Sequence, residues 1–484
     1  MADLTPEQIM AMLEQFYPYK NRFPAYREVP DKPLDRDGVL DLVRTLAQEE
    51  DRLGDSGKVS GSLYLGDHDQ YHFLAQVYET FAHANVLQRD MYPSATKFEG
   101  EIVAMTLALL NGPAVADHHL GEDAVGVITS GGTESLMNPM LVYRERGRIE
   151  KGITEPQVIL PTTAHVALDK ACHYFGIEVV RAPVTDDFVV DVDFVRDHIT
   201  AQTVALVGSA GSYPYGLVDP IGDLSDLAVQ HDIGLHVDGC LGGWLLPWGE
   251  RLGYPIPTFD FRLPGVTSIS ADTHKFGYAL KGTSVLMYRN RTLRQYQYFK
   301  ANDWPGGLYI SPGMSGSRSG GLIAATWAAL VTTGEAGYLE AATRIFSTGA
   351  AIRRAVESVA GLEVFGDPTF LVAFRSVDAA VDIFHVNDYL AEHGWRLNPT
   401  QLPAGLHFCV TLPNTRDGLV ESFARDLADG VDYARSHAGE PARSGALYGL
   451  AGTPAGTEML PFLLSGALDA MYEVPPATAP LSGS

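Results

Sequence analysis

Lysine is scarce after residue 170 of this 484-residue chain, where arginine supplies most of the positive charge. Only three of the nine lysines lie there: Lys275, Lys281 and Lys300. A lysine amine can lose its proton and attack a carbonyl carbon, which an arginine side chain cannot do. Lys275 and Lys281 lie six residues apart in the stretch ADTHKFGYALKG, at the end of an apolar run. They are therefore the first candidates for a nucleophile and a neighbouring cation.

Other polar residues stand at the ends of further apolar runs. The run at 124–129 is followed by the turn SGGTES, which contains Gly132 and Thr133 and opens a helix. Three more runs, at 156–161, 203–209 and 233–239, end near His165, Tyr213 and Asp238. In an open α/β sheet ligands bind beyond the carboxyl ends of the strands, so these residues are expected to converge there with Lys275.

Together these residue types match what pyridoxal 5′-phosphate (PLP) requires of a protein. A lysine amine condenses with the cofactor aldehyde, and a carboxylate pairs with the ring nitrogen so that the ring can accept electrons. A flat side chain such as that of His165 stacks on the ring, and a glycine-rich helix start binds the phosphate. Each residue alone has an ordinary explanation, since a glycine turn can be a simple connection and Asp238 a helix cap. The combination predicts a PLP site with Lys275 as its covalent anchor.

Such a site requires a sheet that presents several strand ends along one edge. Seven apolar runs alternate with helical segments, which predicts an α/β fold with a mainly parallel sheet covered by helices. The runs are 124–129, 156–161, 178–184, 203–209, 233–239, 266–272 and 282–288. Strand-like runs at 362–366, 370–376 and 406–412 predict a smaller α+β domain. The expected divisions are an N-terminal helical segment (1–85), the cofactor-binding domain (86–335), the small C-terminal domain (336–440) and a tail that contributes to the site (441–484).

The composition limits the possible partners. The formal charge of −24 disfavours nucleic acids and anionic membranes, because both would repel the chain. Three scattered cysteines predict neither a disulfide framework nor a zinc cluster, and no metal is expected. Without a signal peptide or a long apolar span, we expect a cytoplasmic protein with a small-molecule substrate.

Longer stretches resemble the sphingosine-1-phosphate lyases, fold type I PLP enzymes within the PLP-dependent decarboxylase superfamily. The most specific stretches are GVTSISADTHKFGYALKGTSVLMY (265–288) and DWPGGLYISPGMSGSRSGG (303–321). GKVSG, TSGGTES, LHVDGCLGGWL, LHFCVTL and ALYGLAG extend the resemblance over nearly the whole chain from residue 57. The resemblance implies a homodimer with a shared active site. It also implies cleavage of the Cα–Cβ bond of a phosphorylated β-hydroxy amine, which yields a long-chain aldehyde and phosphoethanolamine.

The resemblance also implies roles for individual residues. Lys275 would carry the cofactor, Asp238 would pair with the ring nitrogen and His165 would stack on the ring. Tyr213 would be the catalytic tyrosine that handles the proton of the β-hydroxyl group. Contacts to the cofactor are implied for Gly132, Thr133, His274, Asn85 and, from the second subunit, Ser317. Contacts to the substrate phosphate are implied for Tyr64, Lys281 and Tyr448.

Two positions depart from the family pattern. Gln88 stands where a histidine usually contacts the substrate phosphate, and it can donate a hydrogen bond but carries no charge. Tyr215 stands where a histidine often follows the tyrosine loop. We further expect Lys281 to depress the pKa of Lys275, because like charges disfavour one another.

Other functions stay open on the residues alone. A PLP-dependent amino-acid decarboxylase on the same fold would release CO₂ instead of an aldehyde. An aldolase for β-hydroxy amino acids would retain its activity without a phosphate on the substrate. A non-catalytic protein derived from such an enzyme is disfavoured, because Lys275, Asp238, His165 and Tyr213 are all present.

Overall fold

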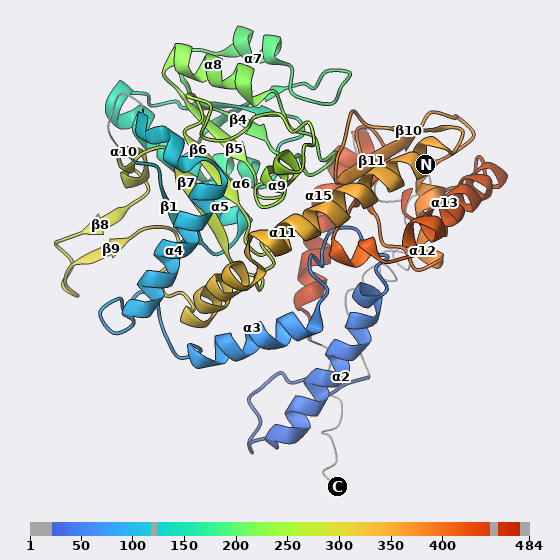
Figure 1. Cartoon of the computed structure of the whole chain (residues 1–484), viewed down its shortest axis with the longest axis horizontal. Coiled ribbons are helices and arrows are strands. Elements are labelled where there is room, and N and C mark those ends of the chain that lie inside the picture. Colours follow the sequence, from blue (N-terminus) through green and yellow to red (C-terminus); the bar gives the residue numbers. More distant parts are fainter. Residues whose placement is uncertain (1–21, 118–122, 446–453, 475–484) are drawn as a thin grey trace.

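A seven-stranded sheet lies at the centre of the computed structural model, which describes residues 22–117, 123–445 and 454–474 (Figure 1). Its order is β1-β7-β6-β5-β4-β2-β3. The strands are β1 (Val125–Thr129), β2 (Gln157–Pro161), β3 (Glu178–Ala182), β4 (Thr203–Ser209), β5 (Gly234–Asp238), β6 (Ser268–Ala271) and β7 (Ser284–Tyr288). Every predicted run of this region forms a strand. The sheet is mainly parallel, as predicted, and β7 alone runs antiparallel to its neighbours β1 and β6.

Alternate side chains of the sheet enter two separate hydrophobic cores. In β4, Leu206 packs into one core and Val207 into the other, as the two-residue period of a strand requires. The helices α5 (Gly132–Lys151) and α6 (Ala167–Phe175) cover the Val207 face. The opposite face is covered by α4 (Pro93–Leu109), α8 (Ile221–His231) and α9 (Leu246–Arg251). Because both faces are buried, the strands read as almost continuous apolar runs in the sequence.

One long helix connects the central sheet to the smaller C-terminal part of the chain (Figure 1). This helix, α11 (Gly320–Glu357), is interrupted at Gly334, whose φ of 60° and ψ of 175° are not helical. The helix α3 (His68–Thr80) packs against α11, and α2 (Arg36–Asp55) precedes it.

The C-terminal part contains a four-stranded antiparallel sheet in the order β10-β11-β13-β12. Its strands are β10 (Leu362–Val364), β11 (Leu371–Ser376), β12 (Asn398–Thr400) and β13 (Gly405–Cys409). Three of them match predicted runs, whereas β12 was missed because it has only three residues and contains a proline. The accompanying helices are α12 (Ile383–Glu392), α13 (Leu419–Ser436) and α15 (Pro454–Tyr472). The domain divisions expected from the sequence stay a prediction.

The remaining elements are short. They are α7 (Val192–His198), α10 (Arg291–Gln295), the hairpin of β8 (Phe299–Ala301) and β9 (Tyr309–Ser311), and the 3₁₀ helices η1 (Gly112–Asp117) and η2 (Leu412–Thr415). Within the three described ranges, no helix is both long and apolar enough to cross a bilayer.

Candidate active site

The carboxyl ends of several strands of the large sheet surround one cavity of about 350 Å³. The predicted residues among its lining are Gly132, Thr133, His165, His274 and Lys275. Cys240, two residues beyond the end of β5, and Asp272, directly after β6, line it as well. These side chains therefore meet at the sheet edge where the sequence placed them, whereas Asp238 and Tyr213, expected to converge there too, are not among the described residues that line the cavity.

The turn between β1 and α5 is held in one conformation by hydrogen bonds to Glu134. Gly131 has a φ of 140°, which a residue with a side chain rarely adopts. The backbone N–H and the hydroxyl of Ser130 both donate to Glu134 Oε2, at 2.8 and 2.7 Å. Glu134 Oε1 accepts from the backbone N–H of Met314 at 3.0 Å, which ties the turn to the segment before α11. The N-terminus of α5 thus faces the cavity in a fixed conformation.

His165 enters the cavity from the β2–α6 connection. Its Nδ1 accepts a hydrogen bond from the backbone N–H of Ala167 at 3.1 Å, so the ring carries its proton on Nε2. The ring of Tyr213 stands edge-on to it, with the ring centres 6.1 Å apart. Tyr213 is half exposed and also contacts the ring of His407, at 5.0 Å between ring centres. The predicted stacking and catalytic side chains are therefore neighbours.

Asp238 is buried at the end of β5, the strand between β4 and β6. Its Oδ1 accepts from the backbone N–H of Cys240 at 3.0 Å and lies 3.4 Å from the Ser270 hydroxyl. Two residues earlier on the strand, burial lowers the pKa of His236 to about 4, although the charge of Asp238 acts in the opposite direction. At neutral pH His236 is uncharged and does not serve as a counter-ion for Asp238.

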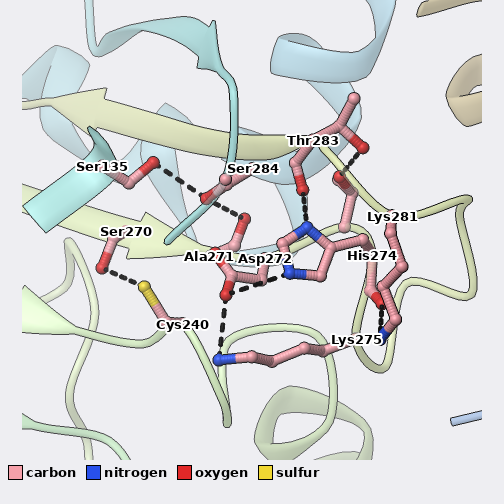
Figure 2. Close-up of polar contacts among 12 residues, drawn as sticks. Ser135, Cys240, Ser270, Ala271, Asp272, His274, Lys275, Lys281, Thr283 and Ser284 are labelled. Carbon is pink, nitrogen blue, oxygen red and sulfur yellow. Dashed lines mark hydrogen bonds and ion pairs between the residues drawn. The ribbon is translucent and has the colours of Figure 1, made fainter. Parts of the chain in front are cut away.

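Lys275 forms a buried ion pair with a residue that the sequence did not single out. Its Nζ lies 2.9 Å from Oδ2 of Asp272, and His274 Nε2 is 3.7 Å from the same oxygen (Figure 2). Burial opposes charge on both groups, yet their attraction raises the pKa of Lys275 and lowers the pKa of Asp272. Lys275 is therefore an ammonium group held in place by Asp272.

Lys281 and Tyr64 lie in a second cavity of about 160 Å³, which Lys275 and His274 also line. Lys281 Nζ donates to the carbonyl oxygens of Ser62 at 3.0 Å and His274 at 3.3 Å. Burial first, and then the charge of Lys275, lower the pKa of Lys281 to about 8. The predicted phosphate-binding pair is thus assembled directly beside the lysine proposed to carry the cofactor.

Known proteins share both the sequence and the structure of this chain. The pyridoxal-dependent decarboxylase conserved domain matches residues 28–375. The sphingosine-1-phosphate lyase of Oryza sativa is 42% identical over 447 residues, which cover 92% of this chain and 81% of that protein. Sphingosine-1-phosphate lyase 1 of Rattus norvegicus is 40% identical, with 93% of this chain and 78% of that protein covered. A solved Burkholderia pseudomallei sphingosine-1-phosphate lyase matches with a TM-score of 0.89 and 50% identity, over 95% of this chain and all of that one.

The chain belongs to the sphingosine-1-phosphate lyase family. A glutamate decarboxylase of Lactobacillus brevis matches with a TM-score of 0.72 over 86% of this chain and 97% of that one. At 20% identity it shares the fold alone. The predicted α/β architecture of a fold type I PLP enzyme is confirmed by both matches.

Family membership implies PLP as the cofactor, and the residues of the cavity fit it. A Cβ atom on Gly132 would lie 2.7 Å from Asp272 Oδ2, so only glycine leaves room beside the turn that would receive the phosphate. The cavity also contains a lysine for the aldehyde and an imidazole ring at its wall. These are the groups that a PLP site requires.

Other residues implied by the family resemblance are not seen to line these cavities. Asn85 Nδ2 donates to Ser317 Oγ at 3.0 Å, and within the described residues neither side chain lines the two cavities. Gln88 is exposed and lines neither cavity in this same part of the chain. Tyr448 lies outside the described residues. Their roles at the site stay predictions.

The expected effect of Lys281 on Lys275 is wrong. Burial lowers the pKa of Lys275, but the charge of Asp272, 2.9 Å away, outweighs burial and raises it. The lowered pKa belongs to Lys281 instead. The signal for Asp272 was present in the sequence, since this acidic residue stands three positions before Lys275 and directly follows the strand β6.

Proposed function

We propose that the chain cleaves the Cα–Cβ bond of a phosphorylated β-hydroxy amine such as sphingosine-1-phosphate, yielding a fatty aldehyde and phosphoethanolamine. The observation that carries the proposal is Lys281, a cation that shares a cavity with Tyr64 and Lys275. A cation at this place suits a substrate phosphate while the reacting carbons lie at the cofactor. The relatives at 40% and 42% identity favour this reaction over amino-acid decarboxylation or an unphosphorylated substrate.

Each polar side chain then has a defined task. The PLP ring supplies a sink for the electron pair that remains when the carbon–carbon bond breaks. Asp238 would pair with the ring nitrogen of the bound cofactor and keep it protonated, and His165 would stack against the ring. Gly132, Thr133 and His274 bind the cofactor phosphate. Tyr213 takes the proton from the β-hydroxyl group, which releases the aldehyde.

The same proposal includes a homodimer whose subunits complete each other's sites. Asn85 and Ser317 contact one another away from the cavities of their own chain, which suits a role toward a second subunit. The β8–β9 hairpin nearby in the sequence exposes several large apolar side chains: Phe299, Trp304, Leu308 and Ile310. Exposed apolar groups of this kind mark association surfaces. We place the enzyme in the cytoplasm on its composition.

The test is incubation of the PLP-loaded enzyme with a sphingoid base in phosphorylated and unphosphorylated form. Mass spectrometry should detect fatty aldehyde and phosphoethanolamine only with the phosphorylated base. Release of CO₂ from amino acids without any aldehyde would establish the decarboxylase alternative. Equal cleavage of both bases would show that Lys281 does not bind a substrate phosphate.

A further inference from the structure

Asp272 stands between the anchoring lysine and the phosphate turn. One oxygen, Oδ2, is 2.9 Å from Lys275 Nζ. The same carboxylate lies against Gly132, where a Cβ atom would be 2.7 Å from Oδ2 and 3.0 Å from Oδ1. Oδ1 is buried and has no hydrogen-bond partner among the described residues. The carboxylate therefore touches the ammonium group on one side and borders the anion-binding turn on the other.

This arrangement poses a chemical problem for cofactor attachment. Lysine attacks an aldehyde only as the neutral amine, but the ion pair with Asp272 keeps Lys275 protonated. The neighbouring Lys281 does not drive the proton off Lys275, because of the two lysines it is Lys281 whose pKa is lowered, to about 8. A proton must leave Lys275 before it can react.

The phosphate of the cofactor provides the means to move that proton. A phosphate ester near neutral pH carries close to two negative charges. Placed at the start of α5, it would lie beside the Asp272 carboxylate. A second anion there raises the pKa of the carboxyl, so the carboxylate becomes a stronger base. The effect on Lys275 is smaller, because the carboxylate lies between the turn and the ammonium group. The nearest proton is on Lys275.

We propose that Asp272 takes the proton from Lys275 when a phosphate enters the turn, so that phosphate binding switches on covalent attachment of the cofactor. The N–H bond of Lys275 breaks and an O–H bond forms on Asp272. An ammonium–carboxylate pair thus becomes a neutral amine and a neutral acid, and the net charge is unchanged. The amine then attacks the aldehyde carbon, and water leaves.

The test separates the phosphate from the aldehyde by using pyridoxal, which has no phosphate, together with inorganic phosphate. Attachment of pyridoxal to the cofactor-free chain is followed by absorbance. In the wild type, saturating inorganic phosphate should accelerate attachment by about tenfold or more. This is the effect of lowering the pKa of the Lys275 amine by one unit. In Asp272→Asn, attachment without phosphate should be faster than in the wild type, because Lys275 has lost its counter-ion. Added phosphate should then change the attachment rate of Asp272→Asn by less than about twofold. A shift of one pKa unit on the amine would change that rate about tenfold.

Cys240→Ala is the matched control, because Cys240 lines the same cavity without contacting Lys275 through a hydrogen bond. It should retain the phosphate acceleration. A wild type that phosphate does not accelerate, or an Asp272→Asn variant accelerated as much as the wild type, would overturn the inference. If Asp272→Asn does not fold, infrared difference spectra of the wild type decide instead. A protonated-carboxyl band must appear when inorganic phosphate binds, and its absence would equally overturn the inference.

The inference concerns attachment of the cofactor and is independent of the substrate. A chain that shows this phosphate effect but leaves phosphorylated sphingoid bases intact would refute the proposed function and leave the role of Asp272 standing.

Discussion

The ammonium nitrogen of Lys281 lies 4.7 Å from the centre of the Tyr64 ring. The two residues come from distant parts of the chain, and the segment that carries Tyr64 also supplies the Ser62 carbonyl that Lys281 contacts. The ring of Tyr64 packs edge-on against Phe276, the residue after Lys275, with the ring centres 4.9 Å apart. The N-terminal segment therefore completes the wall of the cavity that Lys275 also lines.

Loss of the Lys281 charge should weaken binding of the phosphorylated substrate. A hydrogen bond to a charged group contributes about 1.5–3 kcal/mol, so Lys281→Ala should lower kcat/KM by about 10- to 100-fold, mainly through KM. The absorbance of the bound cofactor should stay unchanged. Lys300→Ala is the control, because Lys300 is exposed on β8. An unchanged KM in Lys281→Ala would contradict the phosphate role.

The pH dependence of KM should report the state of Lys281. Burial lowers its pKa to about 8, so the cation is present below that pH and is lost as the pH rises through it. Between pH 7 and pH 9, KM for a phosphorylated substrate should rise by roughly tenfold. Lys281→Arg should flatten this rise, because arginine stays protonated. Identical profiles for the two proteins would assign the pH effect to another group.

Removal of the anchoring amine should abolish both cofactor attachment and turnover. Lys275→Ala should show no covalent adduct by mass spectrometry after borohydride reduction, whereas Lys300→Ala should retain it. The variant also leaves Asp272 buried without its partner, which costs several kcal/mol. Its thermal midpoint should accordingly fall below that of the wild type. Turnover at the wild-type rate would show that another amine carries the cofactor.

Removal of the Tyr213 hydroxyl should slow the chemical step more than binding. A positioned acid–base group contributes about 10²- to 10⁴-fold, so Tyr213→Phe should lower kcat by this order with a small change in KM. The ring contacts with His165 and His407 should survive in the variant. Tyr215→Phe is the comparison, because Tyr215 is buried against Phe188 and Phe365. A similar loss of kcat in both variants would indicate a structural effect.

Two buried histidines should make the fold sensitive to acid. Burial lowers the pKa of both His236 and His407 to about 4, whereas an unfolded histidine titrates near 6.5. The unfolded chain thus binds more protons between these values, so the free energy of unfolding falls as the pH drops from about 6.5 toward 4. Denaturant unfolding measured across this pH range should show that the free energy of unfolding declines less steeply in His407→Gln than in the wild type. The exposed His173→Gln should keep the wild-type slope.

Much of the large sheet could be predicted because each strand has its pattern within a few consecutive residues. A strand covered on both faces must be apolar throughout, so each of its seven strands is visible as a run of residues. The polar residue that follows such a run has to lie at the sheet edge, which is why His165 and Lys275 were found. The hairpin of β8 and β9 and the strand β12 were not found, because strands of three residues carry little pattern of their own; β10, equally short, was found because it lies in the longer run at 362–366.

The sequence by itself determined which residue types stand at the strand ends, and with them the cofactor chemistry. Only the tertiary structure decided which charges meet. Lys281 is six positions from Lys275 but pairs with the backbone and ring of the N-terminal segment, whereas Asp272 lies close enough to set the charge of Lys275. Electrostatic attraction depends on the distance through space and on burial, and neither can be read from the spacing of residues along a chain.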